Sequence, residues 1–139
     1  MNTNEFRQLG YRLKLKGLSL PRLYTTDMVR HHSRGRSGET MKHWICKCIV
    51  SKILYDCKHP HLCEYEFPDK TTADVFDMKD MVVIELETGG TQRKQQLKLL
   101  RYRHLLDKKI IRDLYIINIS TLPDNPLSIE RELRKKLHL

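Results

Sequence analysis

The stretch TADVFDMKDMVVIELE, residues 72–87, decides the fold. Two apolar, β-branched runs joined by a short polar linker are typical of an antiparallel hairpin. Side chains alternate along a strand, so Glu85 and Glu87 share one face of the second strand. Normal pairing about the turn places Asp74 across from the Glu85 region. We therefore expect three carboxylates to converge on one face of this hairpin.

Clustered carboxylates in a strand interior need a compensating charge, because burying an unpaired charge is costly. Without a cation, at least one member of the cluster would take up a proton. A bound Mg²⁺ or Mn²⁺ ion would replace this repulsion by ligation. Such an ion can polarise a phosphodiester and activate a water molecule. The hairpin thus predicts a divalent-metal site, and a solvated acidic sheet face is the alternative.

The composition favours a polyanionic partner. The chain has 139 residues, a formal net charge of +9 and a pI near 9.5. A chain of this length forms one compact core, and its charge favours nucleic acid first and an acidic membrane surface second. No segment approaches the ~20 apolar residues of a membrane-spanning helix, and the N-terminus lacks a signal-peptide pattern. We expect a cytoplasmic protein that does not insert into a membrane.

The hydrophobic pattern predicts an α/β fold with the core order α-β-β-β-α-β-α and a central mixed sheet flanked by helices. Ser37 is the expected N-cap of the first core helix. The nearly continuous apolar run at 114–119 predicts a strand covered on both faces, inside the sheet. The expected strands are 61–67, 72–77, 81–87 and 114–119, and the expected helices are about 4–15, 37–55, 91–108 and 128–137.

The helix expected over 91–108 has an apolar side and a strongly basic side. The apolar side is expected to carry Leu97, Leu100, Leu105 and Tyr102. The basic side could follow a DNA backbone, although a charged helix face is often only solvated.

The chain divides into a basic N-terminal segment, residues 1–36, and a core, residues 37–139. The first segment sets basic residues among glycine and proline, and it includes Arg34 and Arg36 in a Gly- and Ser-rich stretch. We expect it to grip DNA as an arm, to form part of a DNA-binding module, or to support dimerisation. A solvated tail is the alternative.

The element order, with Asp74 on the second strand and Glu85-Leu-Glu87 on the third, resembles the PD-(D/E)xK nuclease superfamily. The archaeal Holliday-junction-resolvase-like and RecB-like exonuclease branches are the most similar, and the resemblance covers about residues 37–120. It implies a restriction-endonuclease-like core. It also implies a protein in the cytoplasm of an archaeon or of the host cell of an archaeal virus. It also implies that Asp74 and Glu85 bind the metal and that Glu39 completes the site.

One departure from the family pattern concerns the lysine of the (D/E)xK element, which is replaced by Glu87. Three outcomes stay open. A lysine from the next helix, Lys94 or Lys98, reaches back to the site; or Glu87 acts as an extra ligand or base; or catalysis is lost. RecB-like members carry a Gln and a Tyr on this helix, which Gln95 or Gln96 and Tyr102 resemble. The implied catalytic residues are Asp74, Glu85, Glu87, Lys94, Gln95 and Lys98.

The resemblance and the charge together predict a Mg²⁺- or Mn²⁺-dependent deoxyribonuclease, either an endonuclease or an exonuclease. Its partner would be duplex, single-stranded or branched DNA, and a resolvase-like enzyme would form a homodimer. The alternative is a DNA-binding protein that keeps the nuclease fold without catalysis. The residues expected to contact DNA are Arg34, Arg36, His43, Arg93, Lys94, Lys98 and Arg101.

A second alternative comes from the cysteines, Cys46, Cys48, Cys57 and Cys63. With the neighbouring histidines they offer enough soft ligands for a zinc-stabilised interaction protein. Their spacing differs from the paired knuckles of structural zinc sites, and Cys46 and Cys48 point to different sides of a helix. Buried free thiols are the simplest interpretation. A disulfide between Cys57 and Cys63 is an option for a protein from a hyperthermophile.

Overall fold

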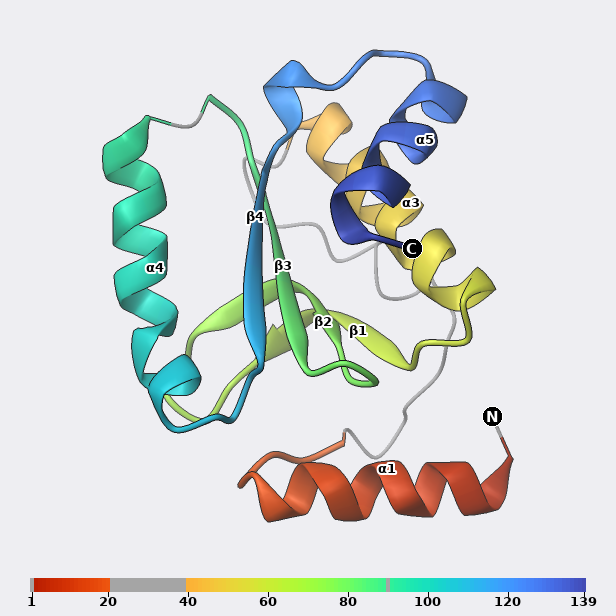
Figure 1. Ribbon diagram of the computed structural model, residues 1–139, viewed down its shortest axis with the longest axis vertical. Helices are drawn as coiled ribbons and strands as arrows, with labels where there is room; N and C mark the ends of the chain where they lie inside the picture. The colour runs from red at the N-terminus through yellow and green to blue at the C-terminus, as the bar shows by residue number, and fades with distance from the viewer. Residues whose placement is uncertain (1, 21–39, 90) are drawn as a thin grey trace.

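The computed structural model describes residues 2–20, 40–89 and 91–139. Its helices and strands follow the predicted order (Figure 1). They are α1 (Thr3–Leu15), α3 (Met41–Asp56), β1 (His61–Glu66), β2 (Thr72–Asp77), β3 (Val82–Glu87), α4 (Gln92–Asp107), β4 (Asp113–Asn118), the short 3-10 helix η1 (Ile119–Thr121) and α5 (Pro126–Leu137). The prediction of an α/β fold with helices flanking a sheet is confirmed.

The sheet is mixed and has the strand order β1-β2-β3-β4. Strands β1, β2 and β3 form an antiparallel meander, and β4 lies parallel to β3 after the crossover through α4. The prediction that residues 114–119 lie inside the sheet is wrong, because β4 is an edge strand. Its apolar run has another cause: Leu114 faces one hydrophobic cluster and Ile117 faces the other.

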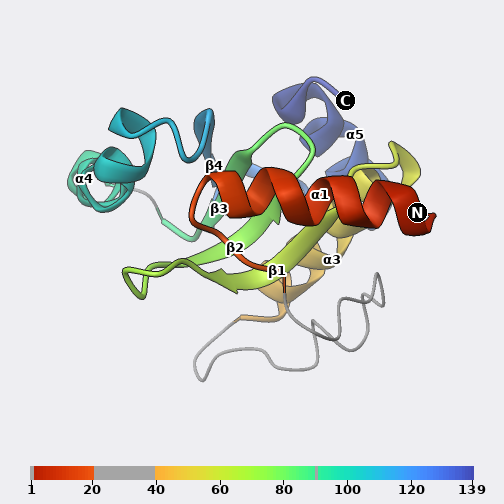
Figure 2. The ribbon, with the colours of Figure 1, turned by 90° about the horizontal axis from the view of Figure 1, so that it is seen from below.

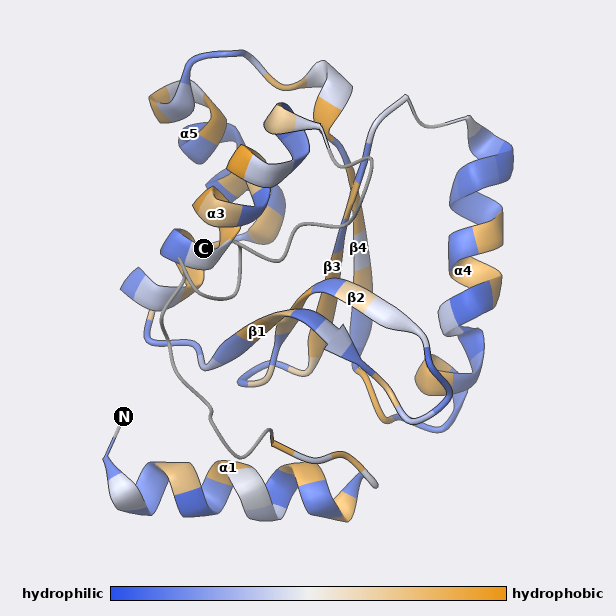
Figure 3. Ribbon diagram, turned by 180° about the vertical axis from the view of Figure 1, so that it is seen from behind, coloured by the Kyte–Doolittle hydropathy of each residue, from blue (hydrophilic) through white to orange (hydrophobic). Residues whose placement is uncertain are grey.

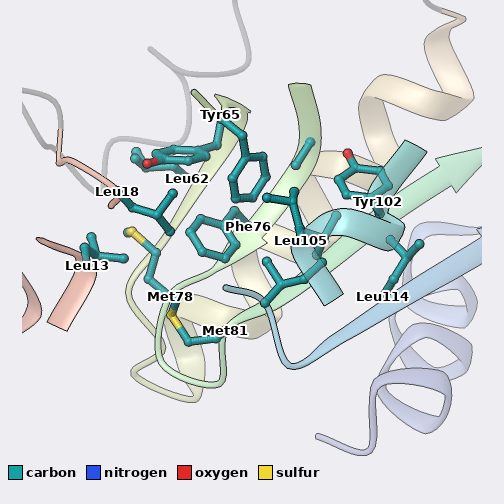
Figure 4. Close-up of a cluster of buried hydrophobic side chains, with 14 of the residues drawn as sticks. Leu13, Leu18, Leu62, Tyr65, Phe76, Met78, Met81, Tyr102, Leu105 and Leu114 are labelled. Atoms are coloured by element: carbon teal, nitrogen blue, oxygen red, sulfur yellow. The ribbon is translucent and has the colours of Figure 1, made fainter. Parts of the chain in front are cut away.

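The two faces of the sheet carry separate hydrophobic clusters. One cluster joins the sheet to α1 and α4, and Figure 4 shows it extending from Leu13 past Phe76 to Leu105 and Tyr102. The other cluster joins the opposite face to α3 and α5 and includes Val75, Ile84, Val50, Ile53, Ile129 and Leu133. The molecule therefore has three layers, with α1 and α4 on one side and α3 and α5 on the other (Figures 1 and 2).

Helix starts are set by capping side chains. Thr40 Oγ1 accepts a hydrogen bond from His43 N–H at 3.2 Å and caps α3. The predicted cap, Ser37, lies outside the described residues. Thr91 caps α4 in the same way, and Asn125 caps α5 ahead of Pro126, which has no N–H that needs an acceptor.

Helix α4 meets the rest of the molecule mainly through the C-terminal half of one face. Tyr102 and Leu105 are buried there as predicted, but Leu97 and Leu100 are 56% and 60% exposed, so that part of the prediction is wrong. Figure 2 shows the helix standing away from the sheet, and Figure 3 shows that most of it is hydrophilic. The first turns of α4 are consequently open to a large partner. Within the described residues, no helix combines the length and apolarity needed to cross a bilayer.

Candidate functional site

Strands β2 and β3 separate at Asp74. Their ladder runs up to the pair Val75–Ile84, and its continuation would place Asp74 opposite Glu85. Asp74 has no Cα partner in the described ladders on either side of β2. Its carboxylate Oδ2 accepts a hydrogen bond from Leu86 N–H at 2.8 Å instead. The expected position of Asp74, across from the Glu85 region, is confirmed.

His43 from α3 contacts both partners of this hydrogen bond. Its Nε2 lies 3.0 Å from Leu86 O and 3.4 Å from Asp74 Oδ2. Burial raises the pKa of Asp74, but the hydrogen bonds from His43 and from Leu86 N–H outweigh it and hold the pKa below its ordinary value. Asp74 is thus an ionised carboxylate near neutral pH. His43, expected to contact DNA, is placed to orient Asp74.

Glu85 is the most buried acid of the site, with a side chain only 3% exposed. Tyr102 OH donates to its Oε1, and Lys98 Nζ donates to its Oε2. Burial first, and the charge of Asp74 second, raise the pKa of Glu85 to about 7, against the opposing effect of Lys98. The facing carboxylates of Asp74 and Glu85 therefore repel each other in a desolvated place, which is the electrostatic situation that a bound cation relieves.

Lys98 is the lysine that reaches back from α4. Its ammonium pairs with Glu87 as well as with Glu85. Burial lowers the pKa of Lys98, but both glutamates outweigh it and raise the pKa above the ordinary value, so the ammonium keeps its charge. Glu85 and Glu87 share the α4 side of β3, as expected from strand alternation. Ile84 and Leu86 belong to the opposite cluster.

The other α4 candidates lie farther from the carboxylates. Lys94 is exposed in the first turn, and Gln95 is half-buried. The structure describes no side-chain hydrogen bond from Lys94 or Gln95 to the acidic residues of the site. Arg93 and Arg101 are exposed on the same helix. The remaining predicted site residues, Arg34, Arg36 and Glu39, lie outside the described residues.

The three acids of the hairpin do not close on one point. In the described part of the chain, one group of three His, Cys, Asp or Glu ligand atoms lies within 4.8 Å of one another, and it is His59, Asp77 and Asp80. Asp74 and Glu85 nevertheless offer the hard oxygen donors that Mg²⁺ and Mn²⁺ prefer, on facing strands. The residues present fit such an ion with Asp74 and Glu85 as its protein ligands and Lys98 beside them.

Among the described residues, the cysteines do not gather into a metal site. None of the four forms a disulfide, so Cys57 and Cys63 are not paired. Burial raises the pKa of Cys63 to about 12, so this thiol stays protonated. The metal-like group in the described residues contains no cysteine. The interpretation of these residues as free thiols, with Cys46 and Cys63 buried, fits the structure best.

A hollow of about 250 Å³ lies beside the site. It is lined by Asp69, Lys70, Thr71, Thr72 and Arg101. Thr72 links it to the carboxylates, because the Thr72 carbonyl accepts a hydrogen bond from Tyr102 OH at 3.2 Å. The hollow could take a phosphate group next to the acidic pair, with Lys70 and Arg101 as its counter-charges.

No protein-family model, curated protein or solved structure matches this chain. The chemistry of the site is distinctive in itself. It joins two neighbouring buried acids, one half-buried lysine and one buried tyrosine, in a chain with a formal net charge of +9. This combination would suit a reaction on a polyanion that a bound divalent metal ion assists.

The raised pKa of Glu85 predicts a pH-dependent stability. Between pH 4.5 and about 7 the unfolded chain releases this proton and the folded chain keeps it. The free energy of unfolding should therefore fall as pH rises through this window, by roughly 3 kcal/mol from this group, and level off above it. Glu85→Gln should remove that fall. Urea unfolding of both proteins at about pH 5 and about pH 8 measures it, and equal pH slopes would contradict the prediction.

Proposed function

We propose that the protein is a metal-dependent DNA nuclease that hydrolyses phosphodiester bonds. The observation that carries the proposal is the position of Lys98. Its ammonium comes from α4, lies on Glu85 and Glu87, and so supplies the cation that the sequence of β3 lacks. An acid pair with an adjacent lysine is the set of groups that phosphodiester hydrolysis uses.

The arrangement of the elements supports a restriction-endonuclease-like core. A helix, α3, precedes the antiparallel meander, and the crossover helix α4 leads to a parallel strand at the edge. In that arrangement the second and third strands carry the acids, as they do here with Asp74 and Glu85.

Each side chain of the site has a separate task in this proposal. Asp74 and Glu85 would hold Mg²⁺ or Mn²⁺, with Glu39 as the third candidate ligand. When bound, the ion would polarise the phosphodiester and lower the pKa of the attacking water. His43 keeps Asp74 ionised and oriented. Tyr102 fixes one oxygen of Glu85.

Lys98 provides positive charge that does not depend on the metal. Its high pKa keeps the ammonium charged, so it can stabilise the negative charge that grows on the phosphate as the bond breaks. Glu87 orients this ammonium through the second ion pair. Glu87 thus occupies the position of the family's lysine, and it orients Lys98, which would act in place of that lysine.

The surface around the site suits a DNA backbone. Arg93, Lys94 and Arg101 are exposed on α4, and Lys70 and Arg101 line the neighbouring hollow. Phosphate contacts of this kind position DNA without selecting its sequence. Arg34 and Arg36, outside the described residues, stay predicted DNA contacts, and a homodimer would suit a branched substrate.

The direct test incubates the full chain with supercoiled, single-stranded and branched DNA in Mg²⁺ or Mn²⁺, beside the same reactions in chelator. We expect cleavage of at least one substrate that depends on the metal. Binding without cleavage in either metal would contradict the proposal and would support a DNA-binding protein with an inactive nuclease fold. Stoichiometric zinc bound by the cysteines, together with unfolding by chelator and no cleavage in Mg²⁺ or Mn²⁺, would instead support the zinc-stabilised interaction protein.

A further inference from the structure

A second group of ligand atoms lies at the hairpin end of the sheet. His59 Nδ1 is 2.8 Å from Asp77 Oδ2 and 3.8 Å from Asp80 Oδ2. Asp77 lies three residues along β2 from Asp74, which is about 10 Å at the rise of a strand. This group is therefore too far from the nuclease site to share an ion with Asp74 or Glu85.

Backbone hydrogen bonds order the Asp77 side chain and the main chain at His59. Asp77 Oδ1 accepts hydrogen bonds from Lys79 N–H at 3.0 Å and Asp80 N–H at 3.4 Å, which leaves Oδ2 directed to His59. His59 N–H donates to Leu54 O at 2.8 Å, so the backbone that carries the imidazole is fixed to the end of α3. The ligands therefore need little rearrangement when an ion binds.

A cavity gives this group access to water. Asp77 and Asp80 line a hollow of about 170 Å³ whose wall also contains Arg112, Tyr115 and His138. Several water molecules fit in such a volume, at about 30 Å³ each. The Asp80 side chain is 41% exposed, whereas His59 and Asp77 are buried, so an ion would enter past Asp80.

We propose that His59, Asp77 and Asp80 bind a divalent transition-metal ion, with Zn²⁺ as the best fit. Imidazole nitrogen with two carboxylates suits Zn²⁺, whereas Mg²⁺ prefers oxygen donors alone. Ligand atoms in a tetrahedral Zn²⁺ site lie about 3.3 Å apart, and the observed 2.8 and 3.8 Å lie on either side of this value. The two carboxylates balance the charge of the ion, and water from the cavity completes its coordination.

The bound ion would tie three parts of the chain together. His59 follows α3, Asp77 ends β2, and Asp80 lies in the turn of the β2–β3 hairpin. This role is structural and independent of the proposed nuclease activity. The ion would stabilise the folded state, because a site assembled from three segments does not exist in the unfolded chain.

The test titrates the full-length protein with ZnCl₂ and, separately, with CoCl₂. Equilibrium dialysis should give one bound Zn²⁺ that Asp80→Asn weakens at least about tenfold. Saturating Zn²⁺ should raise the Tm of the wild type by about 5 °C and leave Asp80→Asn nearly unchanged. Asp107→Asn, at an exposed aspartate of α4, is the matched control, and Asp74→Asn tests the other site. Both should bind Zn²⁺ as the wild type does.

The Co²⁺ spectrum identifies the ligands. Bound Co²⁺ should lack the strong near-ultraviolet charge-transfer bands that thiolates produce, because no cysteine belongs to the group. The Asp80→Asn variant is expected to fold, because the Asp80 side chain is partly exposed. The substitution also leaves the backbone N–H of residue 80 free to donate to Asp77 Oδ1 as before. Equal Zn²⁺ binding by Asp80→Asn and wild type, thiolate bands, or no binding at all would each overturn the proposal. Cleavage of DNA is not measured, so the result does not depend on the nuclease proposal.

Discussion

Glu85→Gln should lower DNA cleavage about 10³-fold or more, because it removes one of the two acids that would hold the metal. Metal ions supply several kcal/mol of transition-state stabilisation, and each 1.4 kcal/mol is about tenfold in rate. The fold should survive, because Gln has the shape of Glu85: its carbonyl oxygen can still accept from Lys98, and its NH2 can donate to the Tyr102 hydroxyl, which keeps Thr72 O as an acceptor. The neutral amide of Gln also avoids the free-energy cost of burying a charge, which is what raises the pKa of Glu85.

The measurement is the single-turnover cleavage rate on the best DNA substrate, at saturating Mg²⁺ or Mn²⁺. Glu66→Gln is the matched control, since it makes the same change at an exposed position on β1. Asp74→Asn should give a loss comparable to that of Glu85→Gln. DNA binding by all three variants should stay within a few-fold of wild type, because phosphate contacts from basic residues carry it. Cleavage by Glu85→Gln at the wild-type rate would remove Glu85 from the mechanism.

Much of the fold could be predicted because hairpins and helices carry local signals. The period of the β3 run set the face that Glu85 and Glu87 share, and the short linker set the register that places Asp74 near Glu85. The position of β4 at the edge could not be predicted in this way. A continuous apolar run shows that both faces are covered, and this holds for a central strand and for a covered edge strand alike.

The site was less predictable where it depends on the placement of a helix. Lys94 and Lys98 are one turn apart on the same face of α4, so sequence spacing cannot choose between them. Which of the two lysines reaches Glu85 depends on the position of α4 along the sheet, and the packing of Tyr102 sets that position. The exposure of Leu97 and Leu100 has the same cause, since only the C-terminal half of α4 reaches the core.

The second group of ligand atoms was missed for a different reason. His59 and Asp77 are brought together by the pairing of His61 with Asp77 in the β1–β2 ladder. His59 precedes its strand, and no spacing motif connects it to the hairpin turn. The available signal was an aspartate at each end of the hairpin turn, Asp77 and Asp80, with a histidine just before the preceding strand.

Lys98→Met should lower cleavage about 10²-fold, the usual cost of losing one preorganised charge at the reacting group. Metal affinity should stay the same or rise, because the ammonium and the metal compete for the Glu85 carboxylate. Methionine keeps the aliphatic stem that fills the space between β3 and α4. The measurements are the cleavage rate and the Mn²⁺ affinity of the same preparation.

Lys94→Met is the matched control, since it makes the same change one turn earlier on α4 at an exposed position. If Lys94 acts only on the DNA backbone, its loss should weaken DNA binding modestly, reduce the salt dependence, and leave the rate of bound substrate unchanged. Lys98→Met should show the opposite pattern, with binding retained and the rate of bound substrate lost. Equal effects of the two substitutions would mean that Lys98 contributes only general positive charge, and the cation missing from β3 would then have to come from elsewhere.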